Sequence, residues 1–389
     1  MTADVSEVPA TRPVPSGEVL LRARDVVKHF PVGGRSLRGS ARDVVHAVDG
    51  VSLDIRRGET VGLVGETGCG KSTLARCLTR LYDLTSGTVE FEGQDISTLS
   101  RRQMRPFRRN MQMIFQDPYG SLNPRRRVGS IIGEPFAVHG LADGADRKRQ
   151  VQELMELVGL NPEHYNRFPA EFSGGQRQRI GVARALALRP KLIVCDEPVS
   201  ALDVSIQAQI INLLSDLQSE FNLTYLFIAH DLSVVQQVSN RVVVMYLGAV
   251  AEVAPADPLY DTPRHPYTAA LLSAAPIADP DQAEARERVV LIGDPPSPVS
   301  PPSGCRFHPR CPKAQPDCAV EIPQLLPRQG DGAEHVAACH HPLADGERLP
   351  TGGAVVATVV GPEAEPDRPV EPGAGSGEPS GPVTFEEQP

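Results

Sequence analysis

The chain has 389 residues, of which 40% are hydrophobic and 22% are charged, as in an ordinary globular protein with enough apolar residues for a sizeable core. It contains no run of eighteen apolar residues, so it is not expected to cross a membrane by itself. Of the net charge of −9, −7 lies in residues 343–389, where nine acidic residues outnumber two arginines. The nearly neutral remainder gives no electrostatic reason to expect a nucleic-acid partner.

The N-terminal third predicts a leader followed by strands. Residues 1–16 are polar and lack the basic and then apolar pattern of a secretory signal, so we interpret them as the flexible leader of a cytoplasmic protein. Stretches 18–30 and 44–55 predict strands of an antiparallel layer. The apolar stretch 60–65 predicts a short strand that leads into a glycine-rich loop and then a helix from about Lys71.

The following residues alternate between strand and helix patterns. Strands are expected at 88–93 and 111–116, and helices over about 128–168 and 174–188. The continuous apolar run 191–197 is typical of a strand buried on both faces of a parallel sheet. A helix at 205–221, a strand at 223–230 and a helix at 233–239 complete the pattern. This alternation predicts an α/β domain with a parallel core.

The segment "GETGCGKST" fits the phosphate-loop pattern G-x-x-x-x-G-K-[ST] between a predicted strand and helix. Glycines let backbone N–H groups converge on a phosphate, the lysine reaches the β/γ oxygens, and the Ser72 hydroxyl binds Mg²⁺. A glycine-rich turn with a chance lysine is the alternative, and the strand–helix context argues against it. The expected nucleotide-binding residues here are Gly65, Glu66, Thr67, Gly68, Cys69, Gly70, Lys71, Ser72 and Thr73.

Two carboxylates end the buried strand "LIVCDE". Asp196 is placed to hold Mg²⁺ beside Ser72, while Glu197 turns a different way and can polarise an attacking water. Acids that only solubilise a strand end are the alternative, which the upstream phosphate loop disfavours.

Three further residues lie at strand ends, where α/β proteins gather ligands. Gln116 could contact Mg²⁺ or the water, His230 could bond the γ-phosphate, and Phe30 could stack on adenine. Taken singly, each is more often polar surface, a structural histidine or core.

The sequence "FSGGQRQRI" places Ser173 and two glycines at the start of a helix, which is a second plausible anion cradle in the same chain. Together with "GETGCGKST", "FQDPYGSLNPR", "LIVCDEPVSALD" and "FIAHDL", in this order and spacing, it resembles the ABC transporter ATPase family from about residue 19 to 275. The resemblance implies an ABC-type P-loop ATPase fold. That fold has a mixed or parallel core sheet, an antiparallel β layer and a helical subdomain at about 117–188.

The resemblance also implies roles, with ATP and Mg²⁺ as ligands. These roles are Phe30 for adenine stacking, Gly65 to Ser72 for the Walker A loop, Gln116 for the Q-loop, Ser173, Gly174, Gly175 and Gln176 for the signature, Asp196 for Walker B, Glu197 for the catalytic base, Asp203 for the D-loop and His230 for the switch histidine. In the family the signature of one subunit covers the ATP held by another. One copy of each motif then requires a second ATPase subunit, expected to be a paralogue.

Four cysteines crowd the C-terminal segment with spacing C-x₅-C-x₆-C-x₂₀-C, namely Cys305, Cys311, Cys318 and Cys339. Because disulfides are uncommon in the cytoplasm, four thiols suggest a metal site. The segments "HPYTAALLSAAP" and "PPSGCRFHPRCPKAQPDC" resemble the C-terminal region of dipeptide/oligopeptide permease ATPases, some of which carry a [4Fe–4S] cluster there. Zinc and unliganded thiols are the alternatives, and His308, His340 and His341 could substitute as ligands. Cys69, Cys77 and Cys195 are expected to be buried small apolar residues.

Four parts of the chain are therefore expected: a leader at 1–16, an ABC ATPase domain at 17–285, a small cysteine-rich extension at 286–342 and a disordered acidic tail at 343–389. The resemblance implies the ATPase subunit of a dipeptide or oligopeptide importer at the cytoplasmic face of the cell membrane. Its partners would be two permease subunits and an extracytoplasmic binding protein. An importer of nickel or another small solute is the alternative. A soluble ABC ATPase or a metal-sensing module fits less well.

Overall fold

The computed structural model describes residues 15, 17–32, 43–117, 120–200, 202–275, 289, 291, 293–328 and 330–350. The expected leader lies almost wholly outside these residues, as does the expected tail from residue 351. Within the described chain, no helix is long and apolar enough to cross a membrane.

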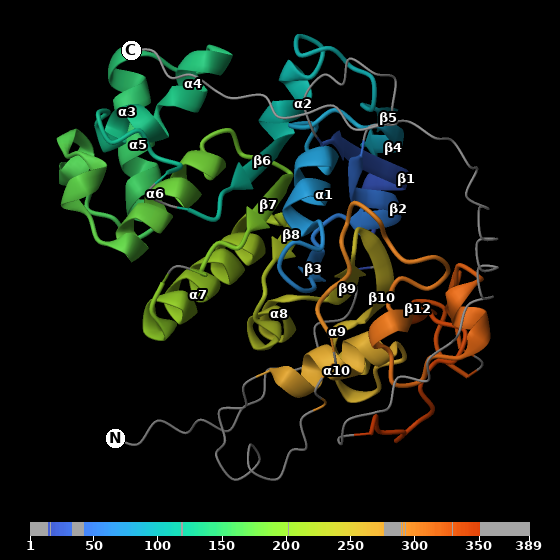
Figure 1. The fold of residues 1–389 in the computed structure, drawn as a ribbon. Helices are drawn as coiled ribbons and strands as arrows, with labels where there is room; N and C mark the ends of the chain where they lie inside the picture. Colours follow the sequence, from blue (N-terminus) through green and yellow to red (C-terminus); the bar gives the residue numbers. More distant parts are fainter. Residues whose placement is uncertain are drawn as a thin grey trace, which may run out of the picture. The chain divides into compact units, whose positions relative to one another are not determined.

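Two sheets organise the described residues (Figure 1). The smaller is antiparallel with the order β2-β1-β4-β5, where β1 is Val19–Pro31, β2 is Val44–Arg56, β4 is Ser86–Phe91 and β5 is Gln94–Asp95. The larger has the order β11-β12-β10-β9-β3-β8-β7-β6. Its strands are β3 (Thr60–Val64), β6 (Met111–Ile114), β7 (Leu192–Asp196), β8 (Thr224–Ile228), β9 (Arg241–Tyr246), β10 (Ala249–Pro255), β11 (Leu325–Pro327) and β12 (Val336–Ala338).

The larger sheet is mixed. Strands β6, β7, β8, β3 and β9 run parallel, whereas β10, β12 and β11 add on antiparallel. All five residues of β7 are buried, because the sheet is covered on both faces. Ile193 and Cys195 pack into one core, and Leu192 and Val194 into the other, as the period of two in a strand requires. This confirms the prediction of an α/β core.

Helix α1 (Lys71–Leu78) lies between the two sheets and packs on both. The opposite face of the larger sheet is covered mainly by α6 (Gly174–Leu186), α7 (Val204–Phe221) and α8 (Leu232–Val238). A group of helices expected at about 117–188 is present (Figure 1). It comprises α3 (Val128–Ile132), α4 (Glu134–His139), α5 (Gly144–Leu157), η1 (Pro162–Asn166), η2 (Pro169–Glu171) and α6. The remaining helices are α2 (Arg105–Asn110), α9 (Ala256–Asp261), α10 (Pro266–Ala274), η3 (His308–Arg310) and η4 (Pro316–Ala319).

The C-terminal residues are more closely integrated than the sequence suggested. Strand β12 pairs with β10, so the segment expected as a separate extension contributes two strands to the large sheet. The disorder expected from residue 343 is wrong for residues 343–350. Leu343 and Leu349 are buried there, and the Leu343 N–H donates to the Arg264 carbonyl (2.8 Å). Arg264 also pairs with Asp345 (2.6 Å), a long-range contact that composition does not reveal.

Candidate nucleotide-binding site

The phosphate loop connects the fully buried strand β3 to helix α1. Two of its glycines are required by close backbone contacts. A Cβ at Gly65 would lie 2.2 Å from the Met245 carbonyl oxygen, and one at Gly70 would lie 2.0 Å from that of Ala47. Lys71 is buried, and its ammonium donates to the carbonyls of Gly65 (2.8 Å) and Glu66 (3.1 Å). The loop is therefore held rigidly, with a cation lying across it.

Asp196 and Ser72 meet at the end of β7, as predicted. The Ser72 hydroxyl donates to Asp196 Oδ1 at 2.6 Å. Asp196 Oδ2 is buried and has no hydrogen-bond partner among the described residues, and its nearest cation is Arg76 at 3.7 Å. A buried carboxylate with an unused oxygen beside a hydroxyl is a fitting ligand pair for Mg²⁺.

The Glu197 side chain points away from Asp196 and towards Gln116 and His230. Its backbone has φ 47°, in the left-handed region, and its N–H donates to the Ile228 carbonyl (3.0 Å). The Gln116 amide donates to Glu197 Oε2 at 2.6 Å, and His230 Nδ1 lies 3.8 Å from the same oxygen. Gln116 and His230 each lie two residues beyond their strands, β6 and β8, so that the ends of three parallel strands supply one polar cluster.

Phe30 lies at the end of β1 and is half-buried. Its ring makes an edge contact with Tyr82 at 5.6 Å between centroids, and Lys28 Nζ lies 4.9 Å from its centroid. The Tyr82 hydroxyl accepts a hydrogen bond from Arg76 (3.2 Å). Tyr82 and Arg76 thus connect the aromatic to the Asp196 carboxylate, which sequence reasoning did not foresee.

The signature residues lie apart from this cluster. Ser173 caps α6, accepting from the Gln176 N–H (3.3 Å), while the Gln176 side chain accepts from the Ser173 N–H (3.0 Å). A Cβ on Gly175 would lie 2.5 Å from the side chain of Ile206, so the start of α6 packs closely on that of α7. Asp203 is exposed as the residue before α7. No hydrogen bond or ion pair within the described residues joins Ser173–Gln176 to the phosphate loop.

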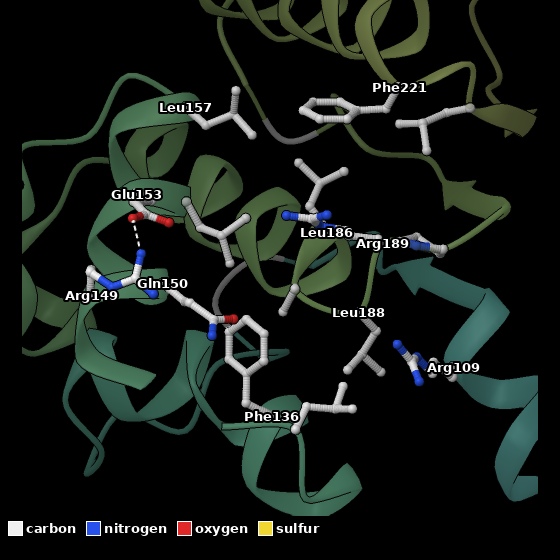
Figure 2. A pocket seen from close by; sticks show the side chains of 15 residues that line it. Arg109, Phe136, Arg149, Gln150, Glu153, Leu157, Leu186, Leu188, Arg189 and Phe221 are labelled. Carbon is white, nitrogen blue, oxygen red and sulfur yellow. Dashed lines mark hydrogen bonds and ion pairs between the residues drawn. The ribbon is translucent and has the colours of Figure 1, made fainter. Parts of the chain in front are cut away.

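A cavity of about 800 Å³ lies elsewhere, beside α5 and the ends of α6 and α7. Figure 2 shows apolar side chains such as Phe136, Leu157 and Phe221 in its walls, with Arg109 and Arg189 among them. None of the predicted site residues lines it.

The four C-terminal cysteines line a single small cavity. All four are free thiols, and burial raises the pKa of Cys311 and of Cys339 to about 12. The three neighbouring histidines already have partners: His308 with the Cys305 carbonyl (2.9 Å), His340 with the Glu321 carbonyl (2.9 Å) and His341 with Asp317 (2.9 Å). Topology therefore brings together thiols up to 34 positions apart, while Cys69, Cys77 and Cys195 are buried elsewhere in the cores.

The fold and the site define an ATP-binding cassette of the P-loop class. The family model described as "ABC transporter" matches residues 48–200, and that described as "Oligopeptide/dipeptide transporter, C-terminal region" matches residues 251–318. The chain is 54% identical over 324 residues to the oligopeptide transport ATP-binding protein AppF of Bacillus subtilis, covering 83% of this chain and 97% of that one. It is 49% identical to the di/tripeptide transport ATP-binding protein DppF of Pseudomonas aeruginosa, covering 83% and 98%.

A solved ATP-binding cassette, a dimer in a post-hydrolysis state bound to ADP and Pi, superposes with a TM-score of 0.54 at 27% identity. The match covers 61% of this chain and 98% of the solved one. The chain belongs to the ABC transporter family, among the oligopeptide/dipeptide transport ATP-binding proteins, and is an ATPase.

The Asp196 geometry gives a prediction about Mg²⁺. Asp196→Asn should lower the ATPase rate about 10²-fold and raise the Mg²⁺ concentration needed for half-maximal rate, because one ligand charge is lost. A Mg²⁺ titration of the steady-state rate measures both. Asp216→Asn on the exposed face of α7 is the matched control. An unchanged Mg²⁺ dependence in Asp196→Asn would contradict the assignment.

Proposed function

We propose that this chain is the ATP-hydrolysing subunit of an importer for dipeptides or oligopeptides. The proposal is carried by one observation: Ser72–Asp196 and Gln116–Glu197–His230 converge at one edge of the parallel sheet, beside the phosphate loop. The names of the relatives, which refer to oligopeptide and di/tripeptide transport, support the choice of solute.

Each group then has a defined task. The phosphate-loop amides and Lys71 bind the β- and γ-phosphates, and Phe30 contacts the adenine. Ser72 and Asp196 would hold Mg²⁺, which neutralises charge that develops on the phosphates. Glu197 Oε2 accepts a proton from the attacking water, while Gln116 and His230, at 2.6 Å and 3.8 Å from that oxygen, orient the carboxylate.

The separation of the signature residues supports action across a subunit interface. The N–H groups at the start of α6 and the Ser173 hydroxyl suit a γ-phosphate held by a second ATPase subunit. Asp203 and the exposed Val204 lie at the start of the adjacent α7, on the surface expected to face that subunit. The dimeric state of the similar solved cassette is consistent with this arrangement. We expect the second subunit to be a paralogue, with nucleotide closing the pair and hydrolysis reopening it.

A groove that reaches Gln116 is the proposed docking site for a permease subunit. It is lined by residues of β6, α1 and the start of the helical group, and it includes the exposed Leu81 and Phe115. A partner helix seated there would touch Gln116 and so reach the Glu197 carboxylate. Two permease subunits and an extracytoplasmic binding protein complete the proposed importer. The chain then lies peripherally at the cytoplasmic face of the membrane.

For the four cysteines we propose a [4Fe–4S] cluster. Tetrahedral zinc with Zn–S bonds of about 2.3 Å requires sulfur atoms about 3.8 Å apart. Among the described residues no three of these sulfur atoms lie within 4.8 Å of one another, whereas one oxygen or nitrogen atom each of Asp317 and His341 lies within that distance of the Cys318 sulfur. Four thiols gathered in one cavity without a disulfide are also a natural ligand set for a cluster. Zinc remains the alternative, and unliganded thiols the null hypothesis.

Metal content tests this proposal directly. Protein purified without oxygen should contain about four irons per chain and absorb in the visible range, and Cys311→Ser should lose most of both. Cys77→Ser, on the buried face of α1, is the control and should retain the iron. Zinc at one equivalent per chain would support the alternative, and colourless protein free of metal would contradict both metal proposals.

Transport itself is tested in vesicles that contain the complete importer. ATP-dependent uptake of a labelled di- or oligopeptide should occur with this chain and stop with Glu197→Gln. Uptake of Ni²⁺ but of no peptide would support the alternative solute instead. ATPase activity that no permease or solute stimulates would favour a soluble ABC ATPase.

A further inference from the structure

An arginine of the cysteine segment pairs with the phosphate loop. The Arg310 side chain is only 8% exposed, and its guanidinium donates to both carboxylate oxygens of Glu66, at 3.1 and 2.9 Å. The same nitrogen lies 3.3 Å from the Tyr246 hydroxyl. Glu66 is the second residue of the loop, and 244 positions separate it from Arg310. The contact therefore connects the phosphate loop with the cysteine-rich C-terminal segment, two parts of the chain that no shared motif relates.

Aromatic packing reinforces this pair. The Glu66 N–H donates to the Tyr267 hydroxyl (2.9 Å). The rings of Tyr246, Tyr267 and Phe307 form a cluster with centroids 4.7 to 5.3 Å apart, in which Phe307 is fully buried. Phe307 and Arg310 both lie between Cys305 and Cys311. The segment that carries these cysteines therefore also packs against the phosphate loop, through Arg310 and the aromatic cluster.

The negative charge of Glu66 makes the contact with Arg310 relevant to nucleotide binding. An unpaired carboxylate in the phosphate loop would repel a nucleotide's phosphates through partly buried surroundings, where charges are weakly screened. Arg310 neutralises this carboxylate, and its guanidinium is itself held by the Tyr246 hydroxyl. Its backbone immediately precedes Cys311, so any group that fixes the Cys311 sulfur also fixes the origin of the Arg310 side chain.

We propose that Arg310 is a positioning residue for the phosphate loop, and that metal loading of the four-cysteine site sets the affinity of this loop for nucleotide through Arg310. The second half rests on the proposed metal site, whereas the first half stands without it. A chain that has lost its metal would then bind ATP weakly and remain idle.

The first experiment measures binding of MgADP by isothermal titration calorimetry. Arg310→Ala should weaken binding up to about tenfold, because the partly exposed Glu66 carboxylate loses its partner beside the bound phosphates. Arg306→Ala is the matched control, since Arg306 lies four residues earlier in the same segment and pairs with Asp49 rather than with the loop. It should change affinity less than about twofold, because the Glu66 carboxylate keeps its partner Arg310. Adding Glu66→Gln to Arg310→Ala should restore most of the affinity, because the unpaired charge is removed.

The outcomes separate positioning from general damage to the fold. Lower affinity in Arg310→Ala alone, rescued by Glu66→Gln, supports the proposal. Equal losses in Arg310→Ala and Arg306→Ala, or an unchanged affinity in Arg310→Ala, would overturn it. Circular dichroism at the titration temperature verifies that each variant is folded.

The second experiment compares metal-loaded protein with the same protein after chelation. Chelation should weaken MgADP binding in the unmodified chain by about the factor that Arg310→Ala causes, and should have little further effect in Arg310→Ala. An equal affinity before and after loss of measured metal would overturn the coupling while leaving the metal site intact. Protein that never contains metal would overturn the proposed site and the coupling together, whereas the Arg310→Ala result would still decide the positioning role.

Discussion

Glu197→Gln is expected to lower ATP turnover about 10²–10⁴-fold, because the variant cannot accept a proton from the attacking water. Nucleotide affinity should change little, since glutamine has the same shape and can still contact Gln116 and His230. ATP should therefore remain bound, and the variant should accumulate as a closed pair of ATPase subunits. Phosphate release gives the rate, and size-exclusion chromatography with light scattering in MgATP gives the assembly.

The control for this variant is Glu156→Gln, on the exposed side of α5. It removes the same charge far from the phosphate loop and should hydrolyse ATP at the unmodified rate. Turnover by Glu197→Gln at the unmodified rate would show that another group is the base. The ATP turnover of Gln116→Ala and His230→Ala would then show whether either residue is needed to activate the water.

Lys71→Ala is expected to produce the second large effect, a decrease of about 10²–10³-fold in kcat/KM for ATP. The Lys71 ammonium is buried across the loop and is the cation that the geometry offers to the phosphates there. Unlike Glu197→Gln, this variant should fail to retain ATP, so a filter-binding assay separates the two.

Lys148→Ala, on the exposed surface of α5, provides the comparison and should bind ATP normally. Tight ATP binding by Lys71→Ala would mean that the loop amides suffice and that the lysine acts only in the chemical step. Loss of folding is checked by thermal unfolding, because Lys71 also bonds the carbonyls of Gly65 and Glu66 and contributes to the shape of the loop.

The parts of the fold and the site that depend on local pattern could be predicted. Strand β7 could be identified because it consists of four apolar residues followed by Asp196. The phosphate loop could be identified because its glycines, lysine and serine occur at the spacing of a known motif. The convergence of Gln116, Glu197 and His230 followed from a general property of parallel sheets, whose carboxyl ends share one edge.

The parts that depend on distant pairing could not be predicted. Strand β12 has three residues and no pattern of its own, and it forms because β10 offers a free edge. Leu343 is buried because it bonds the Arg264 carbonyl and packs on α10. The composition of the surrounding residues does not show these contacts, so Leu343 was predicted to belong to the disordered tail. Arg310 and Glu66 are 244 positions apart, and no pattern in the sequence around Arg310 predicts that it pairs with the phosphate loop.

The most direct test of the account is ATP turnover per subunit across a concentration series, with mass photometry of the same samples. We predict that turnover per subunit falls towards zero at dilutions where only monomers remain, and rises when the second ATPase subunit is added. The reason is that Ser173 and the phosphate loop of one chain lie in separate half-sites. Full turnover per subunit in purely monomeric samples would contradict this account.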